Sequence, residues 1–294
     1  MSWARLSRRQ RELLDEWMPG ARVLADLCWN QVDTVVLHVQ HSGAALVVKA
    51  EGDDGHHLAR ELDAHEGGFV EPWAAQGAAT RVRFADRPAK LLVTDYLPGQ
   101  LAYRTPAAVD PRVHRRAGEL LRAFHAQESR PSAGVDAAAT ARAFAWLDAP
   151  HAIAPDVVQR LRGLLENWQP VEAPLAPTHG DWQPRNWLVD GDIVRVIDFG
   201  RFAFRPAATD LARLAAQEWR EAPECEAAFV DGYGGDPRHP DHWRLIRLRE
   251  AIGTAAWAHQ VGDESFEAQG HRMIAEVLAD AGDGARQHST PPEG

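Results

Sequence analysis

The residues of this sequence that could do chemistry lie close together, between residues 179 and 200. Asp181 and Asn186 are five residues apart on a loop that enters an apolar strand, and Asp198 closes a second strand twelve residues after Asn186. We expect a turn at residues 190–192 to fold the two strands back on each other, because its Asp-Gly-Asp sequence favours a tight turn. The three polar side chains would then meet at one end of the hairpin.

Side chains of this kind suit a hard cation beside a base. Mg²⁺ takes one or two oxygen ligands from a protein and completes its shell with phosphate oxygens, so one Asp and the Asn could hold it against a nucleotide. The other Asp is then free to accept a proton from an attacking hydroxyl group, or to orient that group. The spacing therefore predicts a magnesium site next to a general base.

The segment follows the pattern H-x-D-x-x-x-x-N and then D-F-G, written here as HGDWQPRNWLV and VRVIDFG. This pattern resembles the catalytic loop and metal-binding motif of kinases. The version here is most similar to the aminoglycoside phosphotransferase and choline kinase family of small-molecule kinases. The resemblance implies that Asp181 is the catalytic base, that Asn186 and Asp198 bind Mg²⁺, and that His179 braces the loop.

A lysine upstream agrees with this resemblance. Of the 32 Lys and Arg residues, only Lys49 and Lys90 are lysines. Coding bias explains such a ratio by itself, and for Lys90 the sequence offers nothing more. Lys49 stands at the end of an apolar strand. At this position the family places the lysine that binds the nucleotide phosphates, for which a compact ammonium group is suited. Its usual partner is a Glu on the next helix, for which Glu61 is the best candidate and Glu51 and Glu66 are alternatives.

The sequence LLVTDYLPG at residues 91–99 resembles the hinge of these kinases. The resemblance implies that backbone groups of Asp95, Tyr96 and Leu97 bind the nucleobase of ATP or GTP. The alternative is an ordinary edge strand followed by a turn.

Two departures from protein kinases favour a small-molecule kinase. The stretch at residues 27–34, where a glycine-rich loop would cover the phosphates, contains no glycine, and Gly180 stands where protein kinases usually carry an Arg. Only nine residues separate Gly200 from Asp210, which is too short for a regulatory activation loop. The sequence therefore disfavours a protein kinase.

The elements that must position these residues change in type along the chain. Hydrophobic alternation predicts strands in the first third with one helix between them, and helical periodicity dominates after residue 107. We expect an α+β, protein-kinase-like bilobal fold, with a β-rich N-terminal lobe over residues 1–97 and a mostly helical C-terminal lobe over residues 98–294. The expected strands are 35–39, 45–49, 80–84, 90–96, 187–189 and 194–197. The expected helices are an N-terminal amphipathic surface helix on which Leu6, Leu13, Leu14 and Trp17 recur at helical spacing, and then 57–66, 113–127, 137–146, 157–168, 210–218, 224–233 and 243–261.

The composition bounds the class of protein. The chain has 294 residues, 45% of them hydrophobic and 25% charged, with a formal charge of −10. The acidic balance argues against a nucleic-acid-binding protein, which needs a basic face to displace counterions. No apolar run approaches the roughly 20 residues that span a bilayer, and the N-terminal residues lack a secretory signal pattern. We expect a cytoplasmic protein without nucleic-acid or membrane partners, and the oligomeric state stays open.

The acceptor is the least determined part of the prediction. Residues 201–294 carry 16 acidic and 10 basic side chains, so an acidic pocket could attract a cationic acceptor; ordinary solvated helix faces are the alternative. Trp182, directly after the expected base, could stack on a flat ligand or pack in the core. The acidic candidates for acceptor binding are Asp231, Asp236, Asp263, Glu264 and Glu267.

These patterns predict a Mg²⁺-dependent kinase that transfers the γ-phosphate of ATP or GTP to a hydroxyl group of a small molecule. The acceptor could be an antibiotic, as in aminoglycoside resistance, or a metabolite such as choline, another amino alcohol or a sugar. The alternative from a different class is a non-catalytic nucleotide-binding module that has kept the fold.

Overall fold

The structure is a computed structural model that describes residues 3–28, 34–132, 134–168 and 173–287, with only the backbone of residues 282–287. The chain forms two compact units, each built from separated segments. Unit 1 comprises Met1–Glu128, Pro177–Phe204 and Arg213–Gly235, and unit 2 comprises Ser129–Ala176, Arg205–Ala212 and Asp236–Gly294. The lobe boundary expected at residue 97 stays a prediction.

Unit 1 contains an antiparallel five-stranded sheet in the order β1-β2-β3-β5-β4. Strands β2 and β3 form the expected hairpin, whose turn places Ser42 and Gly43 at positive φ angles of 48° and 84°. Two consecutive left-handed residues match the twist of a tight hairpin. The strands are β1 (Arg22–Asp26), β2 (Val35–His41), β3 (Ala44–Ala50), β4 (Val82–Asp86) and β5 (Leu91–Asp95).

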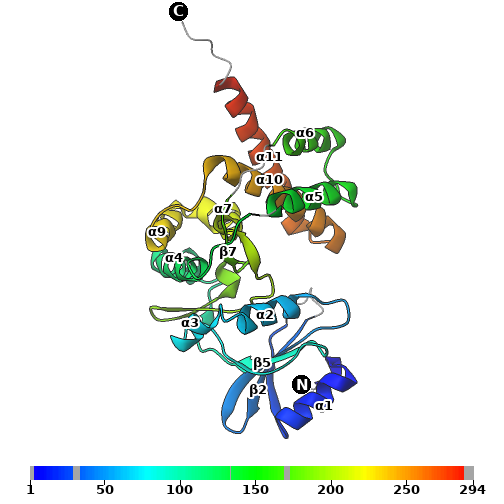
Figure 1. Cartoon of the computed structure of the whole chain (residues 1–294), viewed down its shortest axis with the longest axis vertical. Helices are drawn as coiled ribbons and strands as arrows, with labels where there is room; N and C mark the ends of the chain where they lie inside the picture. Colours follow the sequence, from blue (N-terminus) through cyan, green and yellow to red (C-terminus); the bar gives the residue numbers. More distant parts are fainter. Residues whose placement is uncertain (1–2, 29–33, 133, 169–172, 288–294) are drawn as a thin grey trace, which may run out of the picture. The chain divides into compact units, whose positions relative to one another are not determined.

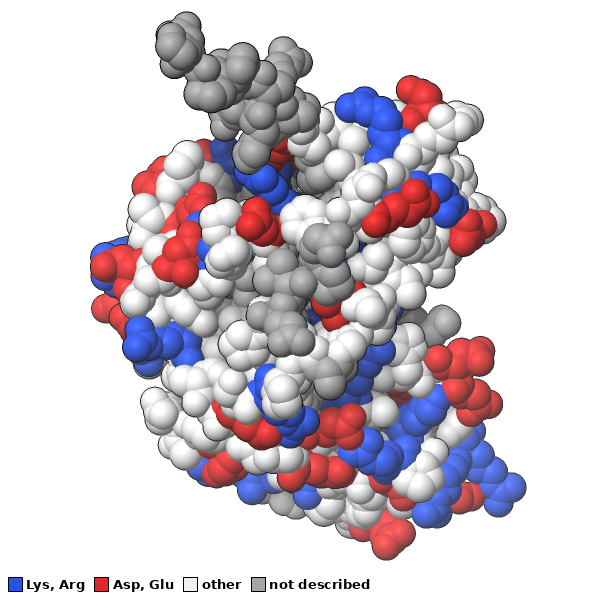
Figure 2. Space-filling view, turned by 45° about the horizontal axis from the view of Figure 1, so that its top comes forward, with Lys and Arg blue, Asp and Glu red and all other residues white. Residues whose placement is uncertain are grey.

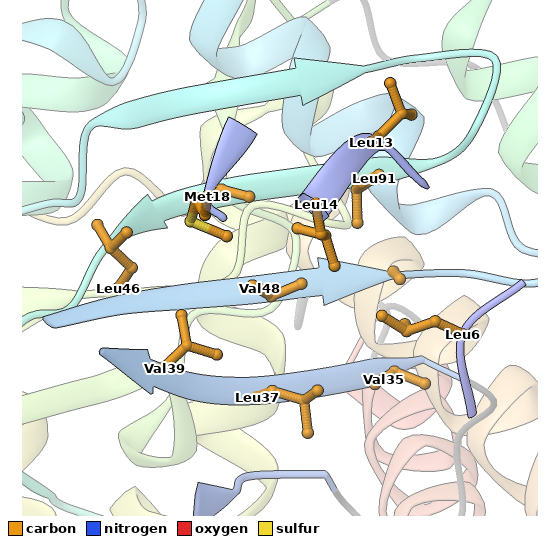
Figure 3. Packing of buried hydrophobic residues seen from close by; sticks show 12 residues of the cluster. Leu6, Leu13, Leu14, Met18, Val35, Leu37, Val39, Leu46, Val48 and Leu91 are labelled. Carbon is orange, nitrogen blue, oxygen red and sulfur yellow. The ribbon is translucent and has the colours of Figure 1, made fainter. Parts of the chain in front are cut away.

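Helix α1 (Arg8–Trp17) covers one face of this sheet. Figure 3 shows its side chains Leu13 and Leu14 lying with Val48 and other alternate residues of the central strands. Side chains of a strand alternate between the two faces, so this packing turns Lys49 of β3 to the opposite face.

Helix α2 (His57–Glu66) lies on that opposite face and has the bounds that the sequence predicts. Its Leu58 and Leu62 are one helical turn apart and pack against Leu92 of β5. Because Leu92 is paired with Lys49 in the sheet register, α2 is held next to the lysine.

A second, three-stranded sheet carries the expected catalytic hairpin. Strands β8 (Trp187–Asp190) and β9 (Ile193–Val196) pair antiparallel around Gly191, and β6 (Gln100–Leu101) pairs with the other edge of β8. The register places Trp187 opposite Val196. The residues just before β8 and just after β9 therefore lie at the same end of the hairpin. Two further strands, β7 (Leu175–Thr178) and β10 (Ala203–Pro206), pair with each other.

Helices α4 (Pro111–His125) and α9 (Pro223–Tyr233) lie side by side in unit 1 (Figure 1). Two glycines permit their close approach: a Cβ on Gly118 would lie 2.3 Å from the Phe229 carbonyl oxygen, and one on Gly232 would lie 2.1 Å from the Arg115 carbonyl oxygen. The other helical segments of this region are η1 (Trp3–Arg5), α3 (Glu71–Ala75), η2 (Pro106–Val109), η3 (Pro184–Asn186), α7 (Ala212–Ala216) and α8 (Glu218–Glu221).

Unit 2 is built around helix α10 (Pro240–Val261), which packs against α5 (Val135–Asp148) and α11 (Glu264–Gln287). A Cβ on Gly270 would lie 2.4 Å from the Ala255 nitrogen, so α11 requires glycine at this crossing. The unit also holds α6 (Pro155–Glu166) and η4 (Ala207–Leu211). No helix in the described part of the chain is long and apolar enough to cross a membrane.

The predicted α+β class is confirmed, one helical prediction needs correction, and α11 is an additional helix. The helix expected at residues 210–218 is divided into η4, α7 and α8, and the break between α7 and α8 falls at Gln217, which leaves the helical region with φ −122° and ψ −96°. Helix α11 was not among the expected helices, although Met273, Ile274, Val277 and Leu278 recur at helical spacing and are buried.

Candidate active site

The carboxylate of Asp181 is buried and surrounded by hydrogen-bond donors, with only 4% of the residue exposed. Gln183 Nε2 donates to Oδ1 at 2.5 Å, and Arg213 Nη1 also donates to Oδ1. Arg185 Nη2 donates to Oδ2 at 3.0 Å and Asn186 Nδ2 donates to the same oxygen at 2.9 Å. Both oxygens of the expected base are therefore held by the protein.

The charge state of Asp181 follows from these neighbours. Burial by itself would raise the pKa of this carboxyl, but the guanidinium groups of Arg213, Arg185 and Arg201 outweigh it and hold the pKa well below its usual range. The carboxylate is therefore ionised at neutral pH and is a weak proton acceptor in the resting site. Such a group suits orienting a hydroxyl more than removing its proton early, which phosphoryl transfer through a loose transition state does not require.

Sequence reasoning missed the arginines that hold Asp181. Arg185 lies inside the motif itself, four residues after the base, and this spacing was a usable signal because η3 brings the two together. Arg213 comes from a segment 32 residues further along the chain. No local pattern connects it to Asp181, so only the fold shows the contact.

His179 holds the catalytic loop in place through two hydrogen bonds. It is fully buried, its Nε2 lies 3.1 Å from the Ile197 carbonyl oxygen, and its Nδ1 accepts the Asp181 N–H at 3.3 Å. A carbonyl only accepts, so Nε2 carries the proton and the ring is neutral. The ring thereby ties the catalytic loop to the end of the strand that leads to Asp198.

Asn186 has the orientation that a metal ligand would need. Its Nδ2 donates to the Asp181 carbonyl oxygen at 2.8 Å and to the Asp181 carboxylate at 2.9 Å. Both contacts use the amide nitrogen, which keeps the amide oxygen available for a cation. Its own carbonyl accepts the N–H of Ile197 at 3.1 Å, and this bond joins the two halves of the motif.

Asp198 is presented in an unusual backbone conformation. Its φ angle is 68°, in the left-handed region that non-glycine residues seldom adopt, and half of its side chain is exposed. Strain of this kind collects at functional sites. Desolvation raises the pKa of its carboxyl, but the Lys49 ammonium more than offsets this and keeps the pKa below its ordinary value. The side chain is thus an exposed, ionised carboxylate.

The two oxygen ligands fit Mg²⁺ better than a metal that needs a complete protein shell. Within the described ranges, no three His, Cys, Asp or Glu side chains gather in a way that could hold an ion. An Asp carboxylate with an Asn amide oxygen is the donor set that leaves room for phosphate oxygens on a hard cation. The site therefore fits a magnesium–nucleotide complex.

Lys49 pairs with Glu61, at 2.7 Å and 2.8 Å to the two carboxylate oxygens. Its ammonium also lies 3.6 Å from the Asp198 carboxylate. Desolvation lowers the pKa of Lys49, but these two carboxylates outweigh it and raise the pKa above its ordinary value, so the ammonium stays charged. The alternatives have other partners: Glu66 pairs with Arg87, and Glu51 accepts the backbone N–H of His57.

Part of the backbone of the expected hinge is already hydrogen-bonded within the protein. The N–H groups of Asp95 and Tyr96 donate to the carbonyl oxygens of Arg81 at 3.0 Å and Ala45 at 3.1 Å. Among the described residues, no acceptor bonds the N–H of Leu97. A nucleobase contact through an N–H at this place would therefore fall to Leu97. Of the stretch expected to cover the phosphates, residues 29–33 lie outside the described residues.

Trp182 lies in the core, although the sequence put it forward as an acceptor-stacking residue. Only 1% of it is exposed. Its ring centroid is 5.8 Å from that of Trp73, 5.7 Å from that of Trp187 and 5.5 Å from that of His179. The aromatic neighbours occupy the surroundings that a stacked ligand would need, and packing is the role that the structure gives this side chain.

The acidic candidates near residue 263 lie at the start of α11. Asp263 Oδ1 accepts the N–H of Phe266 at 3.0 Å, as a helix N-cap does. Glu267 is 3.0 Å from His259 Nδ1, and Glu264 opens the helix. A negative charge in the first turn stabilises a helix, so these acidic residues contribute to the local structure at the start of α11.

The remaining acidic candidates also have basic partners. Asp231 pairs with Arg115, and Asp236 pairs with Arg238 at 2.7 Å. On the face shown in Figure 2, acidic and basic side chains lie among one another rather than in a separate acidic area. The excess of acidic residues after residue 201 therefore does not produce a uniformly acidic surface on that face.

Solved structures similar to this one are kinases of small molecules. Choline kinase LicA from Streptococcus pneumoniae matches with a TM-score of 0.65 and 13% identity over 93% of this chain and 100% of that chain. A thermostable mutant of aminoglycoside phosphotransferase APH(4)-Ia, in a ternary complex with AMP-PNP and hygromycin B, matches with a TM-score of 0.67 and 14% identity over 94% and 99%. Aminoglycoside-3'-phosphotransferase of type VIII matches with a TM-score of 0.60 and 26% identity over 83% and 98%.

The comparisons confirm the protein-kinase-like fold. A comparison with curated protein sequences found no match. The model of the phosphotransferase enzyme family matches residues 20–248, a range that contains Lys49, Asp181, Asn186 and Asp198. The predicted resemblance to aminoglycoside phosphotransferases and choline kinases is thereby confirmed, and the chain belongs to the phosphotransferase enzyme family, whose relatives here are small-molecule kinases.

Proposed function

We propose that this protein transfers the γ-phosphate of ATP or GTP to a hydroxyl group of a small molecule. The observation that carries the proposal is a continuous set of contacts from the expected phosphate-binding lysine to the expected base. Lys49 lies 3.6 Å from Asp198. The N–H of Ile197, directly before Asp198, donates to the Asn186 carbonyl oxygen at 3.1 Å. The side chain of Asn186, at the end of η3 directly before β8, donates to Asp181 at 2.9 Å. The AMP-PNP in the complex of a similar protein agrees with nucleotide use.

Each residue has a distinct part in this reaction. Asn186 and Asp198 would hold Mg²⁺, which neutralises phosphate charge when it is bound. The Lys49 ammonium, kept in place by Glu61, would bind phosphate oxygens. Asp181 would accept a hydrogen bond from the acceptor hydroxyl and align it for in-line attack. Positioning and charge stabilisation then account for most of the rate.

For the acceptor we propose two classes of small molecule. An antibiotic acceptor has the support of the hygromycin B complex among the similar structures, and a metabolite such as an amino alcohol has the support of the choline kinase. We retain both, since the acidic side chains that would favour a cationic acceptor are engaged in local ion pairs or helix caps.

A mass-shift screen tests the function. The protein is incubated with ATP or GTP, Mg²⁺ and a panel of hydroxylated compounds that includes aminoglycosides, nucleoside antibiotics, sugars and amino alcohols. A product heavier by one phosphate group, formed by the wild type and not by Asp181→Asn, is the expected result. Nucleotide binding without any product or hydrolysis across the panel would instead indicate a non-catalytic nucleotide-binding module, and incorporation into protein would indicate a protein kinase.

A further inference from the structure

One face of helix α2 lies along the D-F-G segment, Asp198-Phe199-Gly200. His57, Glu61 and His65 are spaced by four, so they lie on the same side of the helix. His57 Nδ1 is 3.0 Å from the Gly200 carbonyl oxygen, and the His65 ring centroid is 5.8 Å from that of Phe199. Glu61 is connected to Asp198 through Lys49, which contacts both carboxylates. His57 and His65 thus each contact one residue of the segment 198–200, and Glu61 is linked to the third through Lys49.

The contact of His57 differs from the other two because it holds the main chain. A carbonyl oxygen only accepts, so Nδ1 of His57 donates to Gly200. His57 is itself anchored, since its backbone N–H donates to Glu51 Oε1 at 3.2 Å and Glu51 is 5% exposed. A Cβ on Gly200 would lie 3.0 Å from His57 Cβ, so the two residues are in close contact.

The main chain at this place needs support. Asp198 has a φ angle of 68°, which costs free energy in any residue other than glycine and persists only where the surroundings enforce it. The N–H of Gly200 lies 3.4 Å from Asp198 Oδ1, so the orientation of Gly200 bears directly on that carboxylate. The bond from His57 is therefore in a position to determine how Asp198 is presented.

We propose that His57 is a positioning residue for the metal ligand Asp198. By donating from Nδ1 to the Gly200 carbonyl, it holds the left-handed turn that presents the Asp198 carboxylate to a magnesium–nucleotide complex. The inference rests on the proposed function, because it takes Asp198 as a ligand of Mg²⁺ bound with the nucleotide. A residue that only stabilised the fold would affect nucleotide binding equally with and without the metal.

The test compares two variants that differ in one donor. His57→Asn retains an N–H donor near the position of Nδ1, whereas His57→Leu has similar bulk and no donor. The affinity for ADP is measured by titration calorimetry, once with Mg²⁺ and once with EDTA. Thermal unfolding without ligand checks that each variant is folded. His56→Leu, which removes the exposed ring that stacks on His57 at a centroid distance of 4.6 Å but leaves the Nδ1 donor of His57 in place, is the matched control.

We expect His57→Leu to weaken ADP binding about tenfold in Mg²⁺, the effect of one lost hydrogen bond, and less than about twofold in EDTA. His57→Asn should recover most of the loss, and His56→Leu should behave as the wild type. Equal weakening in both conditions, no weakening in either, or an Asn variant no better than the Leu variant would overturn the inference. Should His57→Leu fail to fold, His57→Ala, which also lacks the donor, takes its place.

The wild type separates this inference from the proposed function. If wild-type ADP affinity does not respond to Mg²⁺, the proposed function fails and the inference fails with it. If the wild type responds to Mg²⁺ and His57→Leu responds to the same extent, only the inference is wrong.

Discussion

Asp181 and Asp198 are the two carboxylates of the candidate site, and their surroundings differ. Asp181 is 4% exposed and each of its oxygens accepts from two protein donors. Asp198 has half of its side chain exposed, a left-handed backbone, and Lys49 at 3.6 Å as its ion-pair partner. Asp181 is therefore fixed and balanced by the protein, while Asp198 is open toward a partner from solution. A base needs a fixed orientation, and a metal ligand must be open to the incoming ion. The difference therefore fits the roles proposed for Asp181 and Asp198.

Replacing each carboxylate by its amide should give the largest contrast. Asp181→Asn should lower kcat about 10³-fold, within the range for general bases. It should also lower the free energy of unfolding by about 3 kcal/mol, because the Arg213 guanidinium, whose side chain is 17% exposed, loses its contact with the Asp181 carboxylate. Asp198→Asn should change the free energy of unfolding by less than about 1 kcal/mol, as for an exposed pair. Urea unfolding of both variants checks this, and equal losses would refute the comparison.

Glu218 extends the comparison to a second, partly buried carboxyl group near Arg185. Burial raises the pKa of Glu218 from its ordinary value of 4.5 to about 7, and within the described part of the chain its Oε2 is buried without a hydrogen-bond partner. The folded state therefore favours the protonated acid, so ionisation destabilises the fold as pH rises from 4.5 to 7 and no further above that.

Glu218→Gln should consequently stabilise the protein by about 3 kcal/mol at pH 8 and have no such effect at pH 4. Free energies of unfolding measured at both pH values check this. A stabilisation that is the same at pH 4 and pH 8 would show that packing, and not the charge, accounts for it.

On the Asp198 side, Lys49→Arg should lower kcat/KM about 100-fold, comparable to the loss of one preorganised donor, although the charge is kept. The Lys49 ammonium fits between both oxygens of Glu61 and the carboxylate of Asp198, and a planar guanidinium cannot reproduce three contacts of a compact group. Steady-state kinetics with the acceptor found in the screen check it. An Arg variant as active as the wild type would mean that this region needs only a positive charge.

The other lysine should give the smallest effect. Lys90 Nζ donates to the carbonyl oxygens of Gly52 at 3.1 Å and Gly55 at 2.7 Å, and also to that of Asp53. Lys90→Met should therefore lower the free energy of unfolding by about 1–2 kcal/mol and leave kcat within about twofold. A large loss of kcat would show that this loop, which precedes α2, positions the site as well.

Local patterns made much of the fold predictable. Helix α2 and the hairpin of β8 and β9 appear where hydrophobic periodicity and turn residues place them. The pairing of Lys49 with Glu61 was the leading candidate implied by the family resemblance, with Glu51 and Glu66 as alternatives, and the structure shows the contact with Glu61. Lys90 shows the limit, since its partners are backbone carbonyl groups, which no sequence pattern marks.

Other features of the site depend on contacts between distant segments. Arg213 reaches Asp181 from 32 residues away, and His57 reaches Gly200 from 143 residues away. Trp182 adjoins the base in sequence, yet its ring is turned into the core, because neighbouring residues of a loop can point in opposite directions. Such contacts arise from the packing of whole elements, and the types and spacing of nearby residues do not specify them.

The sequence by itself determined the family, the α+β class and the set of polar residues at residues 181, 186 and 198, because motif spacing and periodicity are properties of short segments. Only the tertiary structure decided that Asp181 is enclosed by arginines while Asp198 stays open, that Glu61 and not Glu51 or Glu66 meets Lys49, and that His57 supports the turn at Gly200. The physical reason is that burial and electrostatic environment are set by side chains that converge from separate segments when the chain folds.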